Sequence, residues 1–199
     1  MPYTTNMTAR THDVAALTLL VSFVLVSPPE SLTVSTALVA VLANQLGGIA
    51  PDIDQPTAPL WRNLPVGRYF GRVFGALVGG HRFFCHSLIG LASFGVVVMM
   101  VLQLIAPIMP NIDTNFVWLA FMIGMISHFV MDSLTKEGVP WLLPLPYKFG
   151  FPPVRAWRLT TGKWVETFVV LPALILLTTW LCYRNYTALS QLLQYHLVK

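Results

Sequence analysis

The chain of 199 residues has the length of a single domain, and its composition excludes an ordinary soluble protein. Hydrophobic residues make up 55% of the chain and charged residues 10%, whereas soluble chains average roughly 25% charged residues. The formal net charge of +4 would suit a nucleic-acid partner, but the positions of the basic residues, given below, argue against one. The two cysteines, Cys85 and Cys182, lie far apart without CxxC spacing, so we expect no disulfide framework.

Five apolar segments predict helices that cross a membrane, a distance that needs about 20 residues. In chain order they are Val14–Val26, Ser31–Ala50, Leu88–Ile108, Asn115–Thr135 and the segment from Lys163 to Tyr183. The first is short for a span, and a signal peptide is the alternative, but no A-x-A-like cleavage site follows it. We expect Thr11 or Asp13 to cap this helix, and Gly47-Gly48 to end the second one. The predicted fold is an all-α, polytopic membrane bundle of about five transmembrane helices.

The segments outside the spans divide into a tail and two long loops. Residues 1–183 are predicted to form one membrane-embedded domain, and residues 184–199 an amphipathic tail. Leucines at helical spacing in the tail predict that it lies along the membrane interface or on a partner. Residues 55–84 mix arginines with aromatic residues, a composition that suits the level of the lipid headgroups.

The basic residues predict the orientation of the chain in the membrane. Five spans place the N-terminus and the loops 51–85 and 135–163 on one side, which holds ten of the twelve lysines and arginines. By the positive-inside rule this side is cytoplasmic. We therefore predict a multi-pass protein of a bacterial inner membrane whose basic excess reflects topology, with no nucleic-acid partner.

The fourth segment carries two ionisable groups near its end. His128 and Asp132 are four residues apart, and residues at this spacing lie above one another on a helix face. Ionisable groups in or near the hydrocarbon are costly and usually mark a functional site. The alternative is a simple ion pair or a hydrogen-bonded helix end.

The other segments bring matching groups to the same side of the membrane. All the candidates lie at the cytoplasmic ends of the predicted spans: His12, Asp52, Asp54, His81, His86, His128, Asp132 and Glu166. His81 and His86 are five residues apart and do not share a helix face, so we expect His81 before the third helix and His86 within it. Such placement predicts that the groups converge on one site.

Imidazole nitrogens and carboxylate oxygens without thiolates form the ligand set of a hydrolytic zinc-type or manganese-type site. Eight candidates are too many for one ion, so we expect two or three Zn²⁺ ions, with Mn²⁺ as the alternative. Taken singly the motifs are weak, since an Asp-x-Asp pair is more often a turn. The prediction depends on their convergence.

Three motifs carry a family resemblance: GGIAPDIDQP, GHRFFCHSL and SHFVMDSLTKEGVPWLLPLP. They resemble the YdjM family of bacterial inner-membrane proteins, which are grouped with the zinc-dependent phospholipase C and P1 nuclease proteins, helical hydrolases with a metal cluster. The resemblance runs from His12 to about Glu166. It implies that Asp54 is a ligand or the catalytic base and that Glu166 is a ligand or a group behind the ligands. The residues it implies as metal ligands are His12, Asp52, His81, His86, His128 and Asp132.

One position departs from the family pattern. The family often has PDIDH where this chain has Gln55. A missing ligand at this position would weaken the site, whereas Gln55 could replace a donor that only supports a ligand.

The predicted activity is cleavage of a phosphoester of a membrane lipid or lipid-linked substrate by a metal-activated water. Asp54 or Glu166 would accept the proton, and Arg82 would neutralise phosphate oxygens. A metal or proton transporter is the main alternative, although its groups should lie nearer the midplane. A membrane scaffold with a structural metal is the third. The sequence does not predict the oligomeric state.

Overall fold

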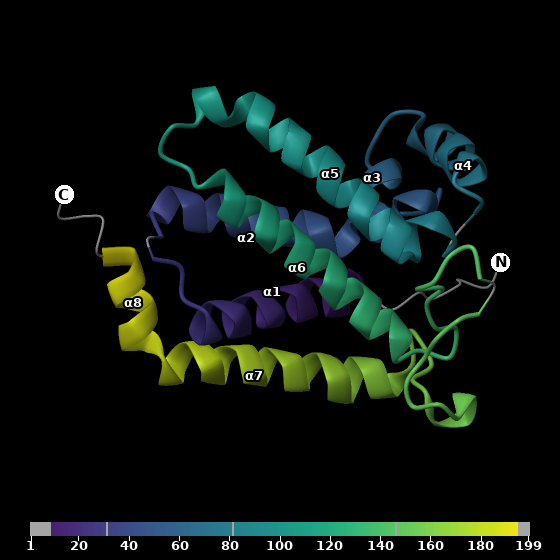
Figure 1. Cartoon of the computed structure of the whole chain (residues 1–199). Coiled ribbons are helices and arrows are strands. Elements are labelled where there is room, and N and C mark those ends of the chain that lie inside the picture. Colours follow the sequence, from purple (N-terminus) through teal and green to yellow (C-terminus); the bar gives the residue numbers. More distant parts are fainter. Residues whose placement is uncertain (1–8, 31, 81, 146, 195–199) are drawn as a thin grey trace.

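The computed structural model describes residues 9–30, 32–80, 82–145 and 147–194. The described residues form helices and loops and contain no β-strand. Five helices are long and apolar enough to cross a membrane, which confirms the predicted all-α polytopic bundle. Figure 1 shows them lying side by side. They are α1 (Ala9–Val26), α2 (Val34–Ile49) with its 3₁₀ extension η1 (Ala50–Asp54), α5 (Leu88–Ile105) with η3 (Ala106–Ile108), α6 (Thr114–Ser133), and the π-helical turn η5 (Glu166–Val170) leading into α7 (Leu171–Arg184).

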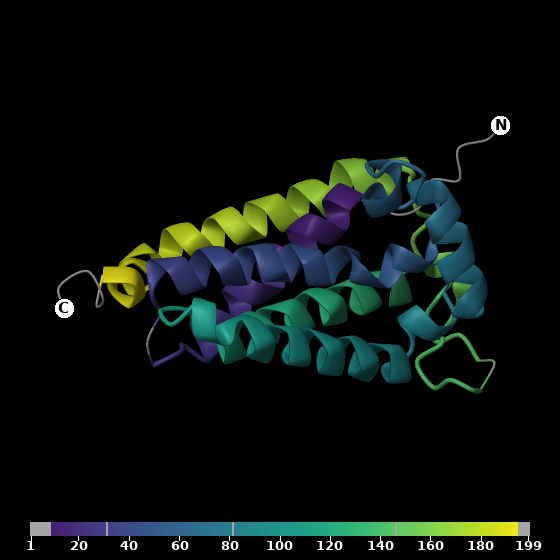
Figure 2. The same cartoon turned by 90° about the horizontal axis from the view of Figure 1, so that it is seen from above.

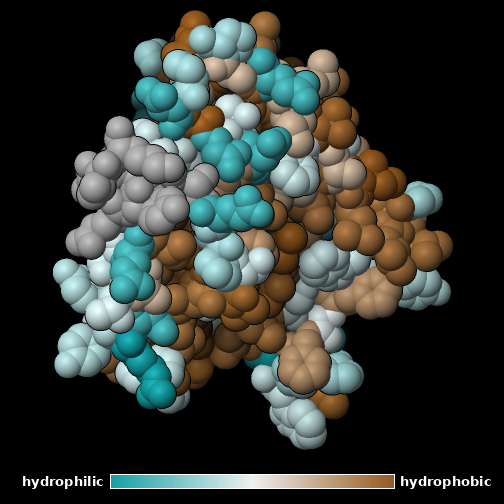
Figure 3. Space-filling view, turned by 60° about the vertical axis from the view of Figure 1, so that its left-hand side comes forward, coloured by the Kyte–Doolittle hydropathy of each residue, from teal (hydrophilic) through white to brown (hydrophobic). Residues whose placement is uncertain are grey.

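Helix α6 is the centre of the bundle. It contacts α1, α2 and α5, and 61% of its span is buried, compared with 6% of the span formed by η5 and α7. The outer faces of the bundle therefore expose apolar side chains, which Figure 3 shows as broad hydrophobic areas on its flank. Such a distribution suits helices whose surroundings are lipid.

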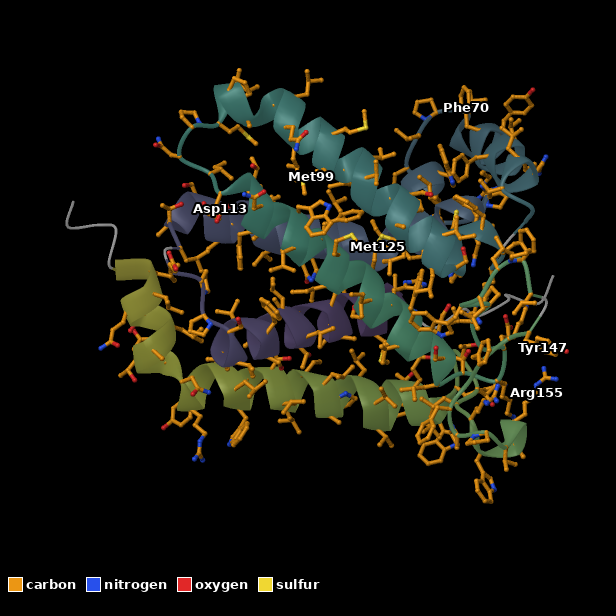
Figure 4. All side chains as sticks on the ribbon, viewed as in Figure 1. Phe70, Met99, Asp113, Met125, Tyr147 and Arg155 are labelled. Carbon is orange, nitrogen blue, oxygen red and sulfur yellow. The ribbon has the colours of Figure 1, made fainter. Side chains whose placement is uncertain are left out.

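The short helices and loops gather at the two ends of the bundle. Helices α3 (Pro59–Arg62) and α4 (Gly67–Leu77), the turns η2 (Phe84–His86) and η4 (Arg155–Trp157), and the loop 134–165 lie at the end where α1 begins. Figure 2 shows α4 running across this end, roughly perpendicular to the long helices. We call it the loop end, and Figure 4 shows Phe70, Tyr147 and Arg155 there, with Asp113 at the other end.

At that other end α8 (Tyr186–Gln194) follows α7. Its side chains Leu189, Leu192 and Leu193 pack against the core that α1, α2 and α6 form. The leucines that the sequence analysis singled out in the tail therefore contact the chain's own bundle.

The predicted end of the second helix at Gly47-Gly48 is wrong, because both glycines lie inside α2. They serve helix packing instead. A Cβ atom on Gly47 would lie 2.1 Å from the carbonyl oxygen of Phe121 in α6, and one on Gly124 would lie 2.1 Å from the carbonyl oxygen of Asn44 in α2. The two backbones touch where neither helix has a side chain, as small residues allow in membranes.

The start of the first helix also differs from the prediction. Thr11 and Asp13 lie inside α1, which already includes Ala9, so neither is its cap. The apolar run marks where lipid-compatible residues begin, and polar residues continue the helix wherever a neighbouring helix accepts their hydrogen bonds. For the second helix, the N-cap is Thr33, whose side chain accepts from the backbone N–H of Thr36.

Candidate metal centre

Six of the predicted site residues meet at the loop end of the bundle. α6 supplies His128 and Asp132, whose Nε2 and Oδ2 atoms lie 3.6 Å apart, in agreement with their predicted position on one helix face. η1 ends α2 as a tight turn and directs its acids back toward α6. The remaining members come from three elements: His12 from α1, Asp52 and Asp54 from η1, and His86 from η2.

Four of these residues form a compact set, which we call the ligand tetrad: Asp52, His86, His128 and Asp132. His86 Nε2 lies 3.4 Å from Asp132 Oδ2 and 3.8 Å from Asp52 Oδ1. His128 Nε2 lies 3.8 Å from the same Asp52 oxygen. Ligand atoms around a tetrahedral ion with bonds of about 2.1 Å are about 3.4 Å apart. The spacing of the tetrad is therefore close to that of one coordination shell.

His128 is oriented by the backbone of α2. Its Nδ1 atom lies 2.6 Å from the carbonyl oxygen of Gly48. A carbonyl can only accept, so Nδ1 carries the proton and the Nε2 lone pair of the neutral ring points into the tetrad. Metal-binding histidines almost always have such a partner behind them.

His86 is held in a comparable way by a carboxylate. Its Nδ1 atom lies 3.6 Å from Asp54 Oδ2, while its Nε2 atom faces the tetrad. Burial opposes a charge on the ring, but the carboxylates of Asp132, Asp54 and Asp52 outweigh it and raise the pKa of His86 to about 9. The surroundings of His86 thus favour a positive charge at this position.

His12 lies beside the tetrad. Its ring stacks on that of His128, with the ring centroids 4.0 Å apart, and its Nε2 atom lies 3.7 Å from Asp132 Oδ1. His12, His128 and Asp132 offer a second set of ligand atoms within 4.8 Å of one another. Because His128 has one free lone pair, the two sets share it rather than each holding a complete shell.

Arg82 contacts the site from the side of Asp132. Its guanidinium group, 5% exposed, lies 2.8 Å from Asp132 Oδ1 and 3.3 Å from Glu137 Oε2. Its backbone N–H donates to Asp54 Oδ2. These contacts hold Arg82 at a φ of +58°, a left-handed conformation that is unfavourable for a residue with a side chain.

Glu166 lies on the far side of His12. It accepts from the hydroxyl of Thr11 at 2.9 Å and from the backbone N–H of Gly162 at 2.7 Å. It does not belong to either set of ligand atoms among the described residues. Glu166 thus joins the start of the fifth span to α1, one residue from His12.

Three further positions complete the account of the predicted site. His81 lies outside the described residues. His86 lies in η2, just before α5, rather than within the helix as predicted, because Ser87 caps the helix after it. Gln55 donates to Asp52 Oδ1 over 3.5 Å, so it stands behind a member of the tetrad.

Cys85 is buried beside the centre without joining it. Burial, followed by the carboxylates of Asp54 and Asp52, raises the pKa of its thiol to about 12, so the thiol stays protonated at neutral pH. It therefore behaves as the small buried hydrophobic residue that the sequence analysis expected.

Sequence reasoning missed several residues that build the site. Gly48 orients His128 through its carbonyl group, and Thr11 binds Glu166. Phe129 stacks on His86 with an interplanar angle of 11°. A signal was present only for Phe129, which follows His128 directly, since backbone carbonyls and threonine hydroxyls show no pattern in a sequence.

The residues fit a divalent metal ion. Among the residues that the structure describes, the buried atoms His128 Nε2 and Asp132 Oδ2 make no hydrogen bond. Buried polar atoms are normally paired, and a cation between these two would satisfy both. Nitrogen and carboxylate oxygen donors suit zinc and manganese.

The fold and this centre define the class of the protein: a multi-pass helical membrane protein with buried histidines and aspartates that could bind metal. The model of the YdjM inner membrane protein family matches residues 7–191, and the chain belongs to this family, as the sequence motifs predicted. Family membership and the five apolar helices together support a multi-pass protein of the inner membrane.

Two curated relatives agree with this assignment. The proteins named Inner membrane protein YdjM from Escherichia coli K12 and from Shigella flexneri are each 30% identical to the chain over 138 residues. The match covers 67% of this chain and 61% of each relative. No solved structure matches the chain.

Proposed function

We propose that this protein is a metal-dependent hydrolase that cleaves a phosphoester of a membrane lipid or lipid-linked substrate at the cytoplasmic face of the inner membrane. The observation that carries the proposal is the ligand tetrad at the loop end of a bundle of apolar helices. The positive-inside rule makes this the cytoplasmic end, since the basic loops are there. The site is then at the level of the headgroups.

The exposure of the tetrad supports access for a substrate. Asp52 is 25% exposed on its side chain, whereas His86, His128 and Asp132 are buried. Catalytic metal sites keep one position open, unlike closed structural sites. We place the opening beside Asp52.

The chain's own residues prepare the site in three ways. Gly48 and Asp54 orient the imidazoles of His128 and His86 so that their Nε2 atoms face one point. Asp132 contributes Oδ2 to the tetrad, while its Oδ1 atom pairs with Arg82, which balances the negative charge. A zinc or manganese ion held there would lower the pKa of a coordinated water to about 7 and polarise a phosphoryl oxygen.

Arg82 and the two predicted bases have different positions relative to the tetrad. Arg82 stabilises a phosphate through the charge it supplies next to Asp132. Asp54 lies directly behind His86 and is our choice for the proton acceptor. Glu166, reached through Thr11, keeps His12 in place.

The number of ions follows from the shared ligands. We propose one Zn²⁺ or Mn²⁺ ion in the tetrad. His12 and Asp132 Oδ1 mark the edge of a second position, where His81 would be a further ligand.

The test uses purified protein in lipid nanodiscs. His128→Ala and Asp132→Ala are each expected to lose the bound metal, measured by elemental mass spectrometry, and to lose cleavage of a phospholipid phosphoester. Glu30→Ala removes an exposed carboxylate and serves as the control. Retention of both metal and cleavage in the two site variants would refute the proposal.

A metal or proton transporter is the competing function. Its binding groups are expected near the bilayer midplane, whereas the tetrad lies at one end of the spans. Metal-ion flux into proteoliposomes with no lipid cleavage would favour the transporter, and unfolding on metal removal with neither activity would favour a structural metal.

A further inference from the structure

A cleft of about 300 Å³ lies on the flank of the bundle between α2 and α5. All of its lining residues are apolar. Leu46, Ile49 and Ile53 line it from α2 and η1, and Phe94 and Val97 line it from α5. Residues three and four apart lie on one face of a helix, so the cleft follows the direction of the two spans.

The cleft opens to the surroundings of the bundle within the membrane. Leu46 and Val97 on its two rims are each 57% exposed, and both belong to spans. Phe121 from α6 is buried and closes the cleft on the side of the bundle. The cleft is therefore open toward lipid and closed toward the core.

One end of the cleft reaches the candidate metal centre. Ile53, which lines the cleft, stands between Asp52 of the tetrad and Asp54 behind it. Asp52 is also the exposed member of the tetrad, so the opening of the site and the end of the cleft are adjacent. Ala58, another lining residue, leads into α3, which carries the exposed Arg62.

We propose that this cleft binds one acyl chain of a phospholipid whose phosphate lies at the opening beside Asp52. The proposal rests on the proposed function for the headgroup end and names the substrate class more closely. A lining without polar groups disfavours a polar ligand, and exposed arginines near its end attract an anionic phosphate. A helix is roughly 10–12 Å wide with its side chains, so two turns would fill more than twice the volume of the cleft.

The first experiment is photo-crosslinking in nanodiscs with phosphatidylglycerol that carries a diazirine in one acyl chain. We expect labelling of the peptides that contain Leu46–Ile53 and Phe94–Val98. Val97→Trp fills the cleft and is expected to reduce this labelling at least fivefold. The control is Val96→Trp, because Val96 is 59% exposed but does not line the cleft, and it should leave labelling within twofold.

A second pair of variants covers the case in which Val97→Trp does not fold. Leu46→Trp fills the cleft from α2, and Leu42→Trp, at 65% exposure and outside the cleft, is its control. Equal labelling in a filling variant and its control would overturn the proposal. Uniform labelling of all lipid-facing helices, including α7, would also overturn it, because it would indicate ordinary lipid contact.

A kinetic readout separates this proposal from the hydrolase itself. Val97→Trp should raise KM for a long-chain phospholipid at least fivefold and leave cleavage of a soluble phosphodiester unchanged. If the wild type cleaves both substrates and the variant has unchanged kinetics, the cleft proposal fails while the hydrolase stands. If the cleft is labelled specifically but no substrate is cleaved, the hydrolase fails while the acyl-chain site stands.

Discussion

Arg82 offers a test of how the buried charges of the site hold the fold together. It contacts two carboxylates at similar distances, Asp132 at 2.8 Å and Glu137 at 3.3 Å. The Asp132 side chain is 1% exposed and the Glu137 side chain 59% exposed. Removing one partner of a buried pair costs about 3–5 kcal/mol, because the other charge stays buried without compensation. An ion pair with an exposed partner is worth roughly 0.2–1 kcal/mol.

We therefore expect Asp132→Asn to lower the free energy of unfolding by about 3 kcal/mol, and Glu137→Gln by less than about 1 kcal/mol. The lower end of the first range applies because Glu137 still faces Arg82 in the Asp132→Asn variant. Both changes keep the size of the side chain, so packing contributes little to the difference.

The measurement is reversible unfolding by sodium dodecyl sulfate in mixed micelles, with chelator present so that metal binding does not contribute. The same pair of variants is then made in an Arg82→Met background. There the cost of Asp132→Asn should fall by about 0.5–3 kcal/mol, the range of coupling between residues in contact. Equal costs for the two carboxylate variants, or an unchanged cost without Arg82, would refute the reasoning.

Three more predictions concern single contacts. Because a metal displaces the proton from His86, whose pKa is raised to about 9, zinc affinity measured by chelator competition should rise about tenfold per pH unit from pH 7 to 9; a flat profile would contradict this. In the metal-free protein the raised pKa stabilises the fold fully below pH 6.5, and that stability is lost as the pH rises through 9. Gly47→Ala forces a Cβ atom to 2.1 Å from a backbone oxygen of α6, and unfolding should show a loss of about 1–3 kcal/mol. Gly95→Ala, which meets only a flexible methionine side chain, should cost less, and equal costs would argue against the close helix contact. Thr11→Val removes the donor to buried Glu166 and should cost about 1–3 kcal/mol in the same assay, whereas an unchanged stability would show that this bond contributes nothing.

The sequence was a good guide to features that depend on local patterns. The predicted span Leu88–Ile108 coincides with α5 and η3, because apolar length against bilayer thickness is a one-dimensional property. The pairing of His128 with Asp132 follows from helix geometry alone and is confirmed. The family assignment from the motifs is also confirmed.

Features that depend on distant partners could not be predicted. Gly47-Gly48 has the same letters whether it stops a helix or admits a neighbouring one, and only α6 decides between them. Arg82 reaches Asp132 across 50 residues of chain. The sequence also gave no sign that the backbone of Gly48 would orient His128.

The contact between α2 and α6 makes metal chemistry depend on interhelical distance. The carbonyl that selects the tautomer of His128 belongs to Gly48, and the neighbouring Gly47 is where the backbones of the two helices meet. A bulkier residue at Gly47 pushes that carbonyl away and lets the imidazole turn its lone pair elsewhere. In a genetic screen such packing variants would mimic lesions in the ligands themselves, although no coordinating atom had been altered.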